Sequence, residues 1–175
     1  MCPSLATQEP TTCPAGSFCP AGTARAQACP PGTFSNQTGA QSRSVCTPCP
    51  PGMYCSLYGA TTPQGPCLEG YFCQGGAAEP TPDSSADFPK NGPCPAGHYC
   101  PAGCLSPVPC PLGSVRNTSG GVSMEDCFTC PAGYYCSTEG LTSPSGPCAA
   151  GFYCPFDFSS TTPYAFICPK VSISV

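Results

Sequence analysis

Residues 46–73 read CTPCPPGMYCSLYGATTPQGPCLEGYFC, and residues 127–154 repeat them as CFTCPAGYYCSTEGLTSPSGPCAAGFYC. The two stretches are identical at 15 of 28 positions. The eight cysteines from Cys13 to Cys73 recur at one constant offset, from Cys94 to Cys154, with no insertion or deletion between the copies. So strict a register is typical of units that stack on one another. It predicts two tandem superrepeats, and we call the offset from Cys13 to Cys94 the superrepeat period.

A shorter motif lies inside the superrepeat. Cys-x-x-Gly occurs eight times, and in six copies it extends to Cys-x-x-Gly-x-aromatic-Cys. The copies beginning at Cys29 and Cys110 lack the second cysteine. The eight glycines are Gly16, Gly32, Gly52, Gly70, Gly97, Gly113, Gly133 and Gly151.

The composition indicates a chain held together by disulfides. Of 175 residues, 19 are cysteine, 46 are glycine or proline, only 23 are Leu, Ile, Val or Phe, and none is tryptophan. So few large aliphatic residues cannot offset the entropy of folding through one hydrophobic core. This cysteine density is typical of an oxidising, extracellular compartment. It argues against a cytosolic enzyme, a Rossmann fold, a TIM barrel and a helical bundle.

The charge pattern points to few classes of partner. The formal net charge is −4, and 8% of residues are charged. No basic patch is present, so we expect neither nucleic acid nor an anionic membrane as a partner. No apolar stretch is long enough to cross a membrane, and no signal peptide is visible. A surface with so little charge suggests covalent glycans or partner chains as the source of solubility.

The repeat predicts the domain organisation. We expect residues 1–12 to end a preceding repeat, 13–93 to form superrepeat 1 with a linker at 74–93, 94–167 to form superrepeat 2, and 168–175 to start another repeat. Because both ends fall within a repeat, we expect the chain to be part of a longer array.

The expected fold is small and disulfide-rich, with little or no helix. Glycine and proline at this density interrupt helices and long ladders. Segments such as GMYC and GYYC predict strands of two to four residues, joined as short hairpins along an elongated rod. Cys-Pro favours an extended cysteine, and the motif glycine allows a turn with positive φ. We expect the motif aromatic to lie across a neighbouring disulfide.

The block CPPGTFSNQTGAQSRSVCTPCPPGMYC, residues 29–55, resembles the ephrin-receptor-like cysteine-rich repeat, a relative of tumour-necrosis-factor-receptor and EGF-like modules. Residues 110–136 match it again, with Val115 in place of the aromatic. The resemblance covers most of the chain. It implies tandem extracellular modules, as in large surface proteins that include mastigoneme-like fibre and cell-coat proteins.

Two disulfide schemes fit the period. The receptor-like scheme, implied by the resemblance, pairs Cys29–Cys46, Cys49–Cys67 and Cys55–Cys73, with the same pattern in the second superrepeat. The ladder scheme, which we favour because it uses 18 of 19 cysteines, links successive motifs. Its pairs are Cys2–Cys13, Cys19–Cys49, Cys29–Cys46, Cys55–Cys67, Cys73–Cys94, Cys100–Cys130, Cys110–Cys127, Cys136–Cys148 and Cys154–Cys168. Cys29–Cys46 and Cys110–Cys127 belong to both schemes.

Cys104 breaks the register of the superrepeat, because Thr23 stands at the matching position. The ladder leaves this cysteine over. We expect it to be free or to form an intermolecular bond with a neighbouring chain; re-pairing with Cys94 or Cys100 is the local alternative.

Metal and catalytic chemistry find little support. Cys46–Cys49 and Cys127–Cys130 have zinc-knuckle spacing, but a zinc site needs two such pairs about 12 to 20 residues apart, and these lie a whole superrepeat period apart. His98 is the only histidine, so no nucleophile–base arrangement is indicated. Glu125–Asp126 is the only adjacent acidic pair, too little for a calcium site. We expect no cofactor and no enzymatic activity.

Two sequons repeat in phase. Asn36 in Asn-Gln-Thr and Asn117 in Asn-Thr-Ser lie one superrepeat period apart in polar loops, and we expect both to carry N-linked glycans. The stretches 60–66, 78–85 and 158–163 are rich in Ser, Thr and Pro and are candidates for O-glycans.

These features together predict a structural component of an extracellular filament, cell coat or appendage, assembled from copies of the same or a similar chain. The alternative is the ligand-binding ectodomain of a cell-surface receptor. The aromatics occupy motif positions shared by the units, which favours the structural role.

Overall fold

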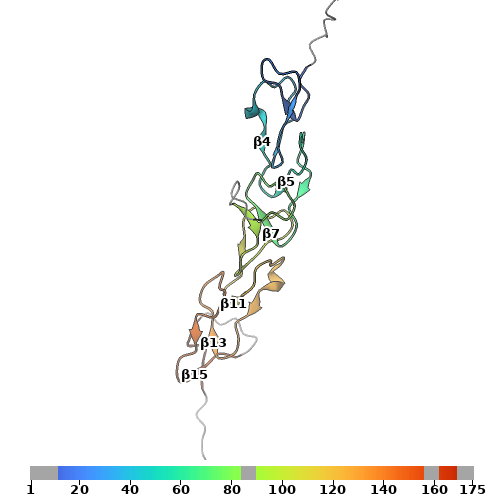
Figure 1. The fold of residues 1–175 in the computed structure, drawn as a ribbon. Coiled ribbons are helices and arrows are strands. Elements are labelled where there is room, and N and C mark those ends of the chain that lie inside the picture. The colour runs from blue at the N-terminus through green and yellow to red at the C-terminus, as the bar shows by residue number, and fades with distance from the viewer. Residues whose placement is uncertain (1–11, 84–89, 156–161, 169–175) are drawn as a thin grey trace, which may run out of the picture.

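The computed structural model is a long, narrow rod of short hairpins (Figure 1). It describes residues 12–83, 90–155 and 162–168. Eight units follow one another along the rod, each beginning at the cysteine of one Cys-x-x-Gly motif. We number them 1 to 8 in chain order: 13–28, 29–48, 49–66, 67–93, 94–109, 110–129, 130–147 and 148–167.

Each unit is one antiparallel hairpin. The first strand begins directly after the motif glycine, and the return strand ends directly before the next unit's first cysteine. The pairs are β1 (Ser17–Phe18) with β2 (Gln27–Ala28), β3 (Thr33–Phe34) with β4 (Thr47–Pro48), β5 (Met53–Tyr54) with β6 (Gly65–Pro66), β7 (Tyr71–Cys73) with β8 (Asn91–Pro93), β9 (His98–Tyr99) with β10 (Val108–Pro109), β11 (Ser114–Val115) with β12 (Phe128–Thr129), β13 (Tyr134–Tyr135) with β14 (Gly146–Pro147), and β15 (Phe152–Tyr153) with β16 (Phe166–Ile167).

The motif glycine forms the turn that starts each hairpin. In unit 3 the N–H of Met53 donates to the carbonyl of Pro50 at 3.1 Å, and Gly52 has φ +77°. A turn of this kind needs positive φ at its third residue, which glycine adopts without steric cost. The hairpin then closes when the N–H of Cys67 donates to the carbonyl of Gly52 at 2.9 Å. The cysteine of one unit therefore completes the hairpin of the unit before it.

Cysteine supplies most of the buried apolar surface. Of 16 buried apolar side chains among the described residues, 13 are cysteines. Tyr54 of unit 3 packs against Cys67 and Cys73 of unit 4, and Phe72 of unit 4 packs against a cysteine cluster of unit 5. The expected contact between a motif aromatic and a neighbouring disulfide is thus confirmed for these two units.

Helix is nearly absent from the described residues. Two single turns of 3-10 helix, η1 (Arg43–Val45) and η2 (Met124–Asp126), lie at matching positions of units 2 and 6. None of the described helices is long and apolar enough to cross a membrane. The predicted class, a small disulfide-rich fold of short hairpins, is confirmed.

The expected linker at 74–93 is anchored at both ends. Its last residues form β8, and the buried side chain of Asn91 ties the two ends together. Asn91 Oδ1 accepts from the N–H of Gln74 at 2.8 Å, and its Nδ2 donates to the carbonyl of Gly75 at 2.9 Å. Units 4 and 5 therefore follow one another in the rod as the shorter units do (Figure 1).

Candidate functional site: the stacking surface of the repeat

Every unit contains one disulfide, and none of the eight described disulfides joins two units. Six bonds span six residues within the motif, and two span 17 residues. The paired Cα atoms lie between 5.5 and 6.5 Å apart, within the usual range for a disulfide. The pairs are Cys13–Cys19, Cys29–Cys46, Cys49–Cys55, Cys67–Cys73, Cys94–Cys100, Cys110–Cys127, Cys130–Cys136 and Cys148–Cys154.

The pairing corrects most of the expected ladder. Cys29–Cys46 and Cys110–Cys127 are present, but the other seven ladder pairs are wrong. Cys13 and Cys154 bind Cys19 and Cys148, so neither Cys2–Cys13 nor Cys154–Cys168 forms. The receptor-like pairs Cys49–Cys67 and Cys55–Cys73, with their counterparts in the second superrepeat, are wrong as well. The reason is local: the turn at the motif glycine folds the second cysteine back beside the first.

The sequence held a signal for this pairing. The two motifs without a second cysteine have Ser35 and Arg116 in its place, and their units contain another cysteine instead, Cys46 and Cys127. Each unit therefore keeps a partner for its first cysteine. Counting cysteines unit by unit, rather than over the superrepeat, would have favoured pairs within units.

Backbone hydrogen bonds hold successive units together. At the junction of units 4 and 5, the N–H of Gly70 donates to the carbonyl of Cys100, Cys73 donates to Cys104, and Gly103 donates back to Cys67, at 2.8 to 2.9 Å. The first bond recurs as Gly16 to Ser35, Gly32 to Cys55, Gly52 to Cys73, Gly97 to Arg116, Gly113 to Cys136 and Gly133 to Cys154. The third recurs as Gly39 to Cys13, Gly59 to Cys29, Gly76 to Cys49, Gly120 to Cys94 and Gly140 to Cys110. The same contact is therefore used along the rod.

In four places, glycines also bring one unit against the unit two places on. A Cβ added to Gly52 of unit 3 would lie 2.5 Å from the carbonyl oxygen of Gly103 in unit 5. Gly16 with Gly59, Gly70 with Gly120 and Gly97 with Gly140 form the same kind of pair. At Gly16, Gly52 and Gly97 the backbones approach too closely for a Cβ, so glycine is required there. The contact at Gly70 is looser, with 3.3 Å from its added Cβ to the carbonyl oxygen of Gly120.

Cys104 is free and buried. Its side chain is 6% exposed, its thiol donates to the carbonyl of Ser106 at 2.9 Å, and burial raises its pKa. It occupies the place after the loop glycine that Ala60 and Ala77, also buried, hold in other units. This position explains the cysteine as a small apolar residue, and its burial leaves the sulfur with little access to solvent.

Two cysteines remain, Cys168 and Cys2. Cys168 is free and exposed, and its N–H donates to the carbonyl of Gly151 at 2.8 Å, as the first cysteine of a further unit would. Cys2 lies outside the described residues.

Both sequons lie on the surface. Asn36 follows β3 and Asn117 follows β11, and both residues are exposed in matching loops. This arrangement leaves room for glycans, which stay a prediction. Part of two Ser/Thr/Pro stretches, at 84–85 and 158–161, lies outside the described residues.

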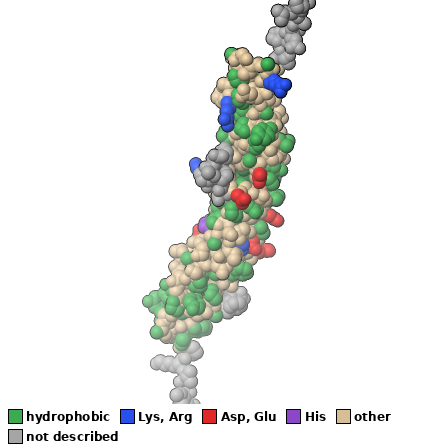
Figure 2. All heavy atoms as spheres, viewed as in Figure 1, with side chains coloured by type: hydrophobic (Ala, Val, Ile, Leu, Met, Phe, Trp, Pro, Cys, Tyr) green, Lys and Arg blue, Asp and Glu red, His purple; other side chains and the backbone are tan. Residues whose placement is uncertain are grey.

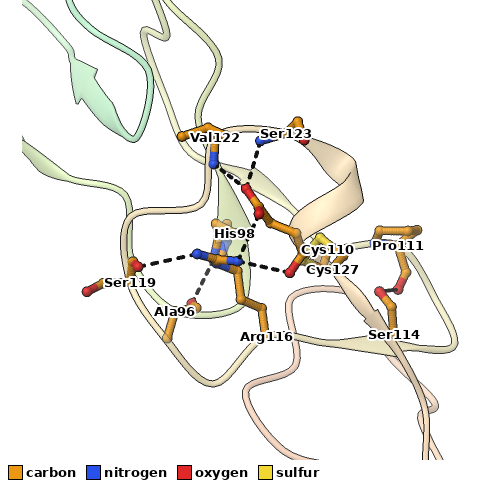
Figure 3. Close-up of a disulfide and its surroundings, with 11 residues drawn as sticks. Ala96, His98, Cys110, Pro111, Ser114, Arg116, Ser119, Val122, Ser123 and Cys127 are labelled. Atoms are coloured by element: carbon orange, nitrogen blue, oxygen red, sulfur yellow. Dashed lines mark hydrogen bonds and ion pairs between the residues drawn. A yellow bond between two sulfur atoms is a disulfide. The ribbon is translucent and has the colours of Figure 1, made fainter.

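Unit 6 contains an ion pair that the sequence did not predict (Figure 3). Arg116 is 7% exposed, and its guanidinium donates to the carbonyls of Asp126 and Ser119. The Asp126 carboxylate lies 3.8 Å from Arg116 and accepts from the N–H groups of Val122 and Ser123, and these two hydrogen bonds lower its pKa. The pair braces the loop beside the Cys110–Cys127 disulfide. Unit 2 has Ser35 and Val45 at the matching positions.

The remaining candidates for metal or catalytic chemistry are the zinc-knuckle cysteines and His98. Cys46 and Cys49, and likewise Cys127 and Cys130, belong to different disulfides, so none of these sulfurs is available to zinc. The Nδ1 atom of His98 lies 3.1 Å from the carbonyl oxygen of Ala96. Across 12–83, 90–155 and 162–168, no three side chains of His, Cys, Asp or Glu gather as a metal site.

Comparison with known proteins gives no identity: no family profile matches the chain, and no curated protein matches it. The chain is a cysteine-rich repeat array, and its many disulfides suggest an extracellular or secreted protein. What the described residues present, repeatedly, is a surface for stacking one unit on the next.

Proposed function

We propose that this protein is a structural component of an extracellular filament, cell coat or appendage. One observation carries the proposal: the same backbone hydrogen bond, from the motif glycine N–H of one unit to a carbonyl of the next, recurs at each junction from units 1 and 2 to units 7 and 8. Repeating this contact lengthens the rod and does not by itself form a binding pocket. Each disulfide restricts the unfolded chain of its own unit, which stabilises a narrow rod without a large core.

The surface supports the same role. Charged side chains are few and scattered over the face in Figure 2, with no concentrated patch of one sign. Exposed sequons at matching positions are consistent with glycans spaced along one rod. The resemblance of residues 29–55 and 110–136 to ephrin-receptor-like repeats, found in large surface proteins, agrees with this proposal, which assigns the chain no catalytic activity.

A direct test is to locate the chain in its native setting. Gold labelling of an epitope tag, followed by electron tomography, is expected to show labels at regular spacing along a filament or throughout a coat. Peptide mapping after enzymatic deglycosylation is expected to convert Asn36 and Asn117 to Asp. Labels at isolated points on the cell surface, together with a co-purifying soluble ligand, would support a receptor ectodomain instead.

A further inference from the structure

We propose that the first sugar of an N-linked glycan on Asn36 binds in a polar groove of unit 2 and holds the loop that carries it. The inference rests on the proposed function, which favours a glycan at this sequon, and adds what that glycan does. It comes from comparing two matching loops, 35–46 in unit 2 and 116–127 in unit 6. The loop of unit 6 is filled by two side chains that the loop of unit 2 lacks.

The filled loop shows what the other one needs (Figure 3). The Arg116 guanidinium donates to the carbonyls of Ser119 and Asp126. The Asp126 carboxylate accepts from the N–H groups of Val122 and Ser123, at 2.7 and 3.2 Å, just before η2. The N–H groups that precede the 3-10 turn of unit 6 are therefore bound by a side chain of the same unit.

Unit 2 has no such partner. A short polar and an apolar side chain, Ser35 and Val45, stand where unit 6 has its ion pair. The N–H groups of Gln41 and Ser42 correspond to the two that Asp126 binds, and neither has an acceptor among the described residues. These two donors are therefore open to a ligand that brings an acceptor oxygen.

A groove of about 350 Å³ lies beside these donors. Its volume is at the lower end of the range for small-ligand sites. Amide and hydroxyl groups line it, from Gln37, Gln41, Ser42 and Thr47 among others, Val45 adds an apolar contact, and none of the lining residues is charged. A sugar presents hydroxyl groups at the edge of its ring and C–H groups on its faces, so an uncharged lining of this mixed kind suits it.

The sequon brings a sugar to the rim of the groove. Asn36 is exposed, and the next residue, Gln37, lines the groove. The acetamido carbonyl of the first sugar accepts from the two open N–H groups, as the Asp126 carboxylate does in unit 6, and its methyl group packs on Val45. Because the glycan is covalently attached, its effective concentration at the groove is high, and a contact of low intrinsic affinity is enough.

The second sequon is the internal comparison. Asn117 is exposed as well, but Asp126 already binds the N–H groups of its loop. Exposed Phe128 also replaces Thr47 of the groove. A glycan on Asn117 is therefore expected to leave the loop of unit 6 unchanged.

The experiment compares hydrogen exchange of the glycosylated full chain with that of sequon variants, after peptide mapping of site occupancy. Thr38→Ala changes an exposed side chain and removes the glycan of Asn36. The reporters are the N–H groups of Val45 and Cys46, which donate within the η1 turn. We expect their exchange to accelerate by about two- to tenfold without the glycan, which is the net contribution of one hydrogen bond.

The matched control is Ser119→Ala, which removes the glycan of Asn117 and keeps the carbonyl that Arg116 binds. Exchange of the corresponding N–H groups, those of Asp126 and Cys127, is expected to stay the same. Trimming the glycans to their first sugar with an endoglycosidase should keep the protection in unit 2, because only that sugar reaches the groove.

A rescue variant tests the donors themselves. Adding Val45→Asp to Thr38→Ala gives unit 2 the carboxylate that unit 6 has, and we expect it to restore the lost protection. Failure to restore it would show that the glycan does not act through these N–H groups.

The proposal is overturned if an occupied Asn36 can lose its glycan without any change in unit 2, if both sequon variants have equal effects, or if trimming to the first sugar removes the protection. None of these results affects the structural function, which the labelling experiment tests by itself. An unmodified Asn36 in the secreted chain would reject the groove contact and the glycan prediction together, while labels along a filament would still support the structural function.

Discussion

A Cβ atom on Gly52 would lie 2.5 Å from the carbonyl oxygen of Gly103, although the whole of unit 4 separates the two glycines along the chain. No real Cβ tolerates this distance, so the stack can form only with glycine at position 52. The disulfides close single units, whereas glycine contacts and backbone hydrogen bonds join them. Stability within a unit and cohesion between units therefore have different physical origins.

Replacing Gly52 by alanine tests the contact between units. Gly120→Ala is the matched control, because Gly120 has φ +78° against +77° at Gly52 and open space around its Cβ. The control should lose about 1–2 kcal/mol from backbone strain alone. We expect Gly52→Ala to lose clearly more free energy of unfolding, measured by thermal or denaturant unfolding. Equal losses would show that the close approach to Gly103 contributes nothing.

The disulfide pairing predicts the products of peptide mapping. Under non-reducing conditions, Cys49 should be recovered with Cys55, and Cys67 with Cys73. Replacing Cys49 and Cys55 together by alanine should cost about 2 kcal/mol, and replacing Cys29 and Cys46 about 3 kcal/mol, because the longer loop gains more from closure. Recovery of a Cys19–Cys49 peptide would restore the ladder.

Hydrogen exchange of the same variants shows how far each disulfide acts. Because no described disulfide crosses between units, lost protection should concentrate in the altered unit and the units stacked on it. Uniform loss over the described part of the chain would contradict this picture.

Cys104 should react slowly with alkylating reagents. Burial shields its thiol and raises its pKa, so little thiolate forms at neutral pH. We expect exposed Cys168 to be labelled first and Cys104 only after unfolding. Cys104→Ala should cost less than about 1.5 kcal/mol, since alanine fills the same place in other units. A disulfide from Cys104 to a second chain in native material would disprove this assignment.

Lowering the pH should destabilise unit 6 more than the other units. The hydrogen bonds from Val122 and Ser123 lower the pKa of Asp126 below the unfolded value of about 3.9. The stabilisation is therefore complete above that value and is lost as the pH falls through the lowered, folded pKa. Asp126→Asn should reduce hydrogen-exchange protection at neutral pH but have little effect in strong acid. Unit 2, with Val45 at the matching position, is the internal control.

The sequence by itself determined the repeat, the fold class and the place of the hairpins. These features are local: a motif glycine with positive φ makes a turn, and the residues after it pair with those before the next cysteine. The strands expected in GMYC and GYYC are β5 and β13. Cys29–Cys46 and Cys110–Cys127 could be predicted because both period-respecting schemes contained them.

The tertiary structure alone decided the burial of Cys104 and the ion pair of Arg116 with Asp126. It also decided between the competing schemes for the remaining six disulfides, for which the sequence held only the count of cysteines in each unit. Cysteine spacing permits many pairings, and the choice depends on which Cα atoms the turns bring within bonding range. Burial of Cys104 depends on Phe72 in the preceding unit. Contacts between units two places apart, such as Gly52 with Gly103, arise only when hairpins stack, because they join residues that no local pattern connects.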